Sequence, residues 1–156
     1  MRKLPAVEEA RAIMTEAMEW SVWRWLLEKP KVREIADRAT AALDRADRKV
    51  KSGWSDELKQ AYNELAAQEK RKKHQLEEGQ PEQADGISAE IKLLAKEIKA
   101  ADDKAERVRL DAEDAFDLAE RQMSASMARE GARKALRTYD LRESAIRKSE
   151  AAGQSG

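Results

Sequence analysis

The chain has 156 residues, of which 31 are basic and 31 acidic, so 40% of its residues are charged while its formal net charge is zero. It contains 28 alanines but only six glycines and three prolines, and large aliphatic residues are scarce. This composition is typical of an almost entirely helical chain, and it excludes a β-sandwich and a transmembrane protein. Because the sequence has no cysteine, it also excludes a disulfide scaffold and a thiolate-ligated metal site.

The first half predicts three helices, which together form a segment over residues 1–78. Residues 6–29 follow Pro5 and meet no helix breaker before Pro30. Residues 31–52 repeat small or apolar side chains at spacings of four and three and end before Gly53. A third helix begins near Ser55 and loses its apolar face before residue 78. A loop containing glycine and proline is expected over residues 79–86.

The second half has the most regular pattern in the chain. Apolar residues and alanines recur at spacings of four and three from Ile87 to Ala119, and the phase then shifts through Phe116, Ala119, Met123 and Met127. We expect a long coiled-coil-like helix over residues 87–150, either continuous or broken near residues 124–131, and a disordered tail over residues 151–156. The predicted fold is all-α, as a helical bundle or an extended antiparallel coiled coil with a long C-terminal helix.

This long helix offers a seam for self-association. Residues 87–120 have an excess of four acidic side chains, and residues 121–150 have an equal basic excess. Antiparallel copies would set each acidic half against a basic half, and small side chains would let the backbones approach closely. We therefore predict an antiparallel homodimer, with the alternative that helices one to three of the same chain cover the seam. The seam alanines are Ala101, Ala105, Ala112, Ala115 and Ala119.

Three of the four tryptophans lie between residues 20 and 27. This cluster could form the aromatic plug of an alanine-rich core, a contact surface for a protein partner, or a membrane-interface anchor. A membrane is the least expected partner, because the neighbouring Glu19 and Glu28 would repel anionic lipid. The candidate interface residues of the cluster are Trp20, Trp23, Trp25 and Leu27.

Two acidic pairs form the sharpest chemical motif in the sequence. They are Glu16-x-x-Glu19 and Glu34-x-x-Asp37, one on each of the first two predicted helices. If the helices are antiparallel, the four carboxylates can converge on Mg²⁺, which prefers oxygen ligands. This spacing is similar to that of the all-α nucleoside-triphosphate pyrophosphatases of the MazG kind. The resemblance covers residues 16–37 and implies a Mg²⁺-dependent phosphohydrolase with these carboxylates as metal ligands.

Nucleic acid is not an expected partner. The basic run at residues 70–74 could contact phosphates, but residues 54–86 carry five basic and eight acidic side chains, which favours a solvated helix end. The basic N-terminus is not followed by an apolar segment of the secretory kind, so the expected compartment is the cytoplasm.

A thin aliphatic core and an alanine-rich seam favour a protein that needs a partner. The leading functional prediction is a non-catalytic helical interaction module without a cofactor, acting as a self-assembling scaffold, an adaptor or an accessory subunit. Two alternatives stay open. The second candidate is the Mg²⁺-dependent phosphohydrolase, and the third is a peripheral membrane protein that binds through its tryptophans.

Overall fold

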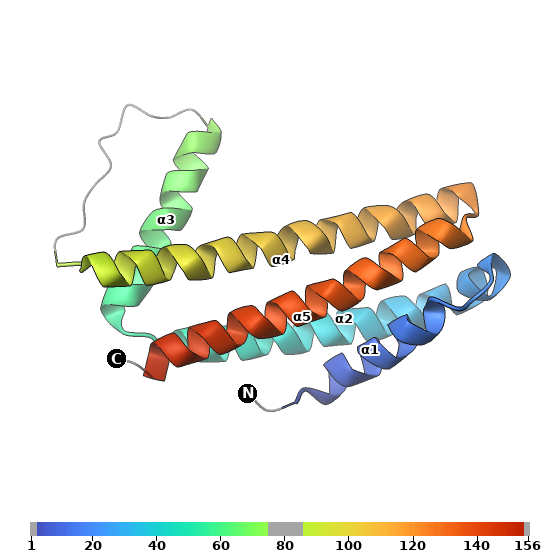
Figure 1. Ribbon diagram of the computed structural model, residues 1–156, viewed down its shortest axis with the longest axis horizontal. Coiled ribbons are helices and arrows are strands. Elements are labelled where there is room, and N and C mark those ends of the chain that lie inside the picture. Colours follow the sequence, from blue (N-terminus) through green and yellow to red (C-terminus); the bar gives the residue numbers. More distant parts are fainter. Residues whose placement is uncertain (1–2, 75–85, 155–156) are drawn as a thin grey trace.

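The computed structural model describes residues 3–74 and 86–154. Within these residues the chain is all-α, as its sequence predicts, and contains no strand. Four helices lie alongside one another as a long body, and α3 projects away from one end of it (Figure 1). The helices are α1 (Pro5–Ala17), α2 (Val22–Ser52), α3 (Asp56–His74), α4 (Ala89–Gln122) and α5 (Ala125–Gln154).

The first two helices do not divide at Pro30, so that prediction is wrong. The helix expected over residues 6–29 ends at Ala17, and α2 runs from Val22 through Pro30 to Ser52. The hydroxyl of Ser21 caps α2 by accepting a hydrogen bond from the backbone N–H of Arg24 at 3.3 Å. This cap and the core contacts of α2 outweigh the cost of a proline inside the helix, which is about 3 kcal/mol.

The predicted long helix is broken into two. Met123 adopts a left-handed conformation with φ 52°, and the hydroxyl of Ser124 accepts a hydrogen bond from the N–H of Met127 at 3.3 Å. The chain reverses there, and α5 returns antiparallel to α4 (Figure 1). Gly131, which also suggested a break, lies inside α5.

The predicted loop and tail are only partly described. Of the loop at residues 79–86, Gly86 alone falls within the described residues, and the rest lies outside them. The tail predicted to be disordered is helical as far as Gln154, because α5 continues through it, while residues 155–156 lie outside the described part.

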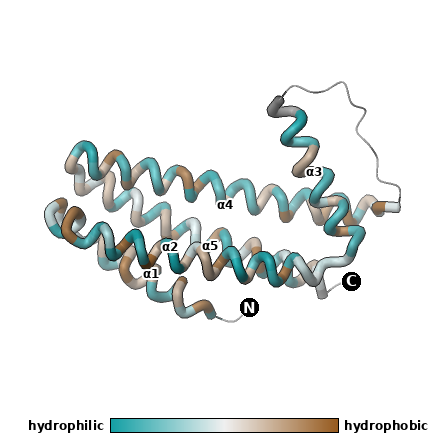
Figure 2. The backbone as a smooth tube through the Cα atoms, turned by 180° about the vertical axis from the view of Figure 1, so that it is seen from behind, coloured by the Kyte–Doolittle hydropathy of each residue, from teal (hydrophilic) through white to brown (hydrophobic). Residues whose placement is uncertain are grey.

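α5 is the central helix of the body and packs against α4, α2 and α1. Hydrophobic positions recur at intervals along otherwise hydrophilic helices (Figure 2), and they meet in a core rich in alanine. A second, smaller cluster joins α3 to the beginning of α4 through Trp54, Leu58, Ala61, Ala95 and Ile98. Among the described residues, no helix combines the length and apolar character needed to cross a bilayer.

Candidate functional site

The tryptophan cluster is divided between the core and the surface. Trp20 and Trp25 are 7% and 4% exposed, and their ring centroids lie 6.5 Å apart. The indole of Trp25 stacks on Phe116 of α4 with 4.9 Å between ring centroids. These three rings therefore close one end of the alanine-rich core, because large flat side chains fill space that alanine cannot.

Trp23 and Leu27 point away from this plug. They are 74% and 79% exposed and lie one turn apart on α2, and Pro30 follows on the same exposed face. We call Trp23, Leu27 and Pro30 the α2 surface strip. Trp23 lies outside the core because α2 turns another face inward, and on that face Trp25 stacks on Phe116 of α4.

The alanine seam is covered within the chain. Ala105, Ala112, Ala115 and Ala119 are buried and Ala101 is half-buried. The covering helix is α5, not the three N-terminal helices, because the turn at Met123 folds the basic second half onto the acidic first half. The buried part of the seam is therefore covered within one chain and needs no second copy.

The four carboxylates predicted to bind Mg²⁺ do not gather. Glu16 instead accepts a hydrogen bond from the guanidinium of Arg24 at 3.0 Å, and the other three, Glu19, Glu34 and Asp37, are exposed. Since α1 ends at Ala17, Glu19 lies beyond that helix, and the first pair loses the helical geometry that the motif requires. No group of three or more acidic or histidine side chains among the described residues could hold a metal ion.

Ion pairs join α2 to α4 near both ends of the body. The ammonium of Lys29 lies 2.5 Å from Glu120, and that of Lys51 lies 2.8 Å from Asp102. The hydrogen bond and charge of Lys29 lower the pKa of Glu120. The hydroxyl of Tyr62 donates to Asp102 at 2.6 Å, and burial together with this carboxylate raises the pKa of Tyr62. These contacts join α2 to α4, and both helices also pack against α5.

Comparison with models of protein families, with curated proteins and with solved structures finds no match for the chain. Two surfaces carry the functional argument instead, namely the α2 surface strip and the space between α2 and α4. Sequence patterns missed the second surface, because Asp37 and Phe116, which both border it, lie far apart in the sequence.

Proposed function

We propose that this protein is a helical interaction module that associates with a second copy of itself through the α2 surface strip. One observation carries the proposal: Trp23 and Leu27 are large and apolar, and yet most of each side chain is exposed. Exposed apolar patches mark contact surfaces. Tryptophan is also among the residues that contribute most to binding when a partner covers it.

The strip has the geometry of a helix that docks along its length. Its three residues have the spacing i, i+4 and i+7, which is the arrangement of anchors in helices that bind through one face. Charged side chains border it, two basic and two acidic, which gives the apolar centre and polar rim typical of protein interfaces. These bordering residues are Arg24, Glu28, Lys31 and Glu34.

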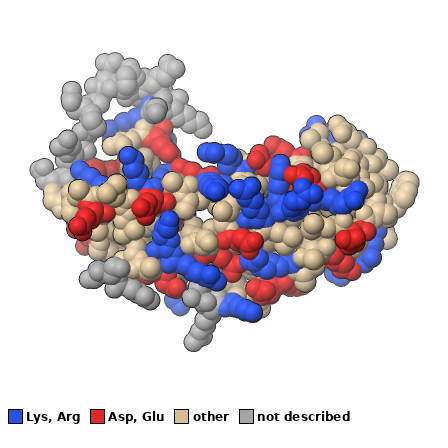
Figure 3. Space-filling model, in the orientation of Figure 1, with Lys and Arg blue, Asp and Glu red and all other residues tan. Residues whose placement is uncertain are grey.

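Charge favours a second copy as the partner. The formal net charge is zero, so there is no net electrostatic repulsion between two copies of the chain. Basic and acidic side chains are also interspersed on the face shown in Figure 3. With antiparallel α2 helices about a two-fold axis near Leu27, Trp23 of each copy would lie over Pro30 and Lys31 of the other. That contact adds a cation–π interaction to the apolar one.

Light scattering coupled to size exclusion tests this association on the full chain. We expect the mass to rise toward that of a dimer with increasing concentration, and Leu27→Ser to return the protein to a monomer. Leu93→Ser is the matched control, since Leu93 is exposed on α4, outside the strip. A wild-type chain that stays monomeric, or two variants that dissociate equally, would contradict the proposal.

Single cysteines test the geometry, because the chain has none of its own. A two-fold axis near Leu27 brings the two copies of residue 27 together, so Leu27→Cys should form a disulfide-linked dimer on oxidation and Leu93→Cys should not. Co-sedimentation of a monomeric protein with liposomes, lost in Leu27→Ser, would assign the strip to a membrane and overturn the proposed dimer.

A further inference from the structure

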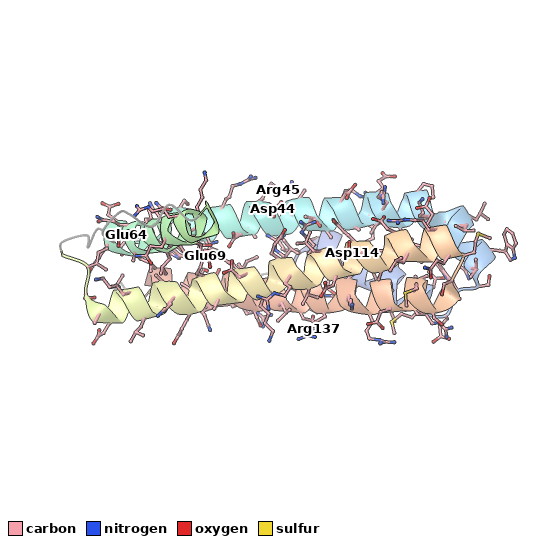
Figure 4. All side chains as sticks on the ribbon, turned by 90° about the horizontal axis from the view of Figure 1, so that it is seen from above. Asp44, Arg45, Glu64, Glu69, Asp114 and Arg137 are labelled. Carbon is pink, nitrogen blue, oxygen red and sulfur yellow. The ribbon has the colours of Figure 1, made fainter. Side chains whose placement is uncertain are left out.

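A groove runs between α2 and α4, whose backbones pack on α5 and stay apart from each other. It consists of two adjoining cavities of about 520 and 490 Å³, which share Thr40 and Arg109 in their walls. Figure 4 shows α2 and α4 from above, running along the length of the body. Each cavity lies within the volume range of small-molecule sites, roughly 300–1,000 Å³.

The groove stays open because its apolar lining is small. Ala36, Ala112 and Ala135 border the larger cavity, together with the edges of Trp25 and Phe116. The ion pairs Lys29–Glu120 and Lys51–Asp102 span the groove near its two ends. Ala112 and Ala135 are buried behind this lining, whereas Ala36 and Phe116 are only partly buried, so an aliphatic chain could cover the exposed parts of these two side chains.

The lining of the groove is acidic, although the chain is neutral. Nine carboxylates and five basic side chains line the two cavities, a surplus of four negative charges. In the larger cavity, Asp37 on α2 and Asp117 on α4 form no ion pair with any described residue. These two carboxylates are available to a cationic ligand.

Tyr139 adds a second and independent indication of a ligand. Its side chain is 4% exposed and lines the larger cavity, and its hydroxyl forms no hydrogen bond to any described residue. Burial, together with the negative charge of Asp37, raises its pKa to about 12. The hydroxyl oxygen is not one of the fully buried unpartnered atoms of the described residues, so it stays accessible from the cavity that Tyr139 lines, and this neutral hydroxyl can accept a hydrogen bond from an N–H donor in the groove.

We propose that this groove binds a linear aliphatic polyamine, with ammonium groups at Asp37 and Asp117 and methylene segments along the partly buried Ala36 and Phe116. A metal ion fits less well, because it needs converging ligands, and no such group exists among the described residues. The carboxylates are instead spread along the walls. The two unpaired carboxylates come from α2 and α4 in the larger cavity, and the acidic lining continues into the smaller one. A polyamine suits such a distribution, because methylene segments separate its charges.

Calorimetric titration of the full chain with spermine at low ionic strength tests this site. Asp117→Asn should raise the dissociation constant by at least about threefold, as expected for loss of one partly solvated charge contact. Asp114→Asn is the matched control, because it makes the same charge change on an exposed residue of α4 that does not line the groove. It should leave the dissociation constant unchanged. Tyr139→Phe should also weaken binding.

Comparing different cations distinguishes binding at this site from general electrostatic attraction to an acidic surface. Spermine should bind more tightly than putrescine, which has fewer ammonium groups, and added salt should weaken binding. Mg²⁺ added at the same total concentration of positive charge should displace little spermine. Undetectable spermine binding, equal weakening by Asp117→Asn and Asp114→Asn, or full competition by Mg²⁺ would overturn the proposal. The test is independent of the proposed dimer, because the strip and the groove occupy different faces of α2.

Discussion

The ring of Phe116 in α4 lies directly against Gly131 in α5, so that a Cβ atom at residue 131 would fall 2.5 Å from the ring. Glycine inside a helix costs about 1 kcal/mol relative to alanine. Here it allows the two antiparallel helices to approach, and Phe116 can then stack on Trp25. One small residue in α5 thereby positions the aromatic plug and one wall of the groove.

Gly131→Ala should therefore lower the free energy of unfolding by about 1–3 kcal/mol through overpacking, despite its better helix propensity. Urea unfolding followed by circular dichroism measures the change. Gly153→Ala is the control, because the nearest atom to its new Cβ would lie at 3.7 Å. That variant should be stabilised by about 0.4–1 kcal/mol. A Gly131→Ala protein as stable as the wild type would refute the close approach.

Replacing tryptophans one at a time should separate the core from the strip. Trp25→Ala removes a buried, stacked indole and should cost about 3–5 kcal/mol of unfolding free energy. Trp23→Ala should change stability by no more than about 0.5 kcal/mol, as is usual for exposed positions. Both are measured by chemical denaturation at a protein concentration low enough for the wild type to be monomeric. Equal losses would contradict the division of the cluster.

The turn between α4 and α5 contains a strained residue. Met123 has φ 52°, a left-handed conformation that costs side chains with a Cβ about 1–2 kcal/mol. Met123→Gly should raise the unfolding free energy by about 0.5–1 kcal/mol. Ser144→Gly, at an exposed position in the middle of α5, should lower it by a similar amount. Thermal melting monitors both variants, and a destabilised Met123→Gly protein would argue against this turn.

Tyr139 should make stability depend on alkaline pH. Burial and Asp37 raise its pKa to about 12, against a partly opposing charge on Arg11, whereas an unfolded tyrosine titrates near pH 10. The folded state holds this proton more tightly than the unfolded state does. The contribution of Tyr139 to the free energy of unfolding is therefore complete below about pH 10 and declines as pH rises toward 12.

Comparison with Tyr139→Phe isolates this titration from that of the lysines. Between about pH 9 and pH 11 the wild type should lose about 1 kcal/mol more unfolding free energy than the variant. Denaturant titrations at the two pH values supply the comparison. Parallel losses would show that the hydroxyl is not held neutral in the groove.

Local signals in the sequence determined the helical character of the chain and several helix boundaries. Alanine content predicts an all-α protein, Gly53 marks the end of α2, and Ser55 caps α3 by accepting a hydrogen bond from the N–H of Leu58 at 3.2 Å. Propensity and capping act over a few residues, so they can be recognised without knowledge of distant contacts.

Tertiary packing decided the remaining features. It determined that α2 continues through Pro30, that Trp25 is buried while Trp23 is exposed, and that α5 covers the seam of α4. It also created the groove, because Asp37, Asp117 and Tyr139 come together only when three helices are assembled. Helical periodicity shows that a face is apolar, but the helix that covers this face is selected by steric fit and charge between segments far apart in the chain.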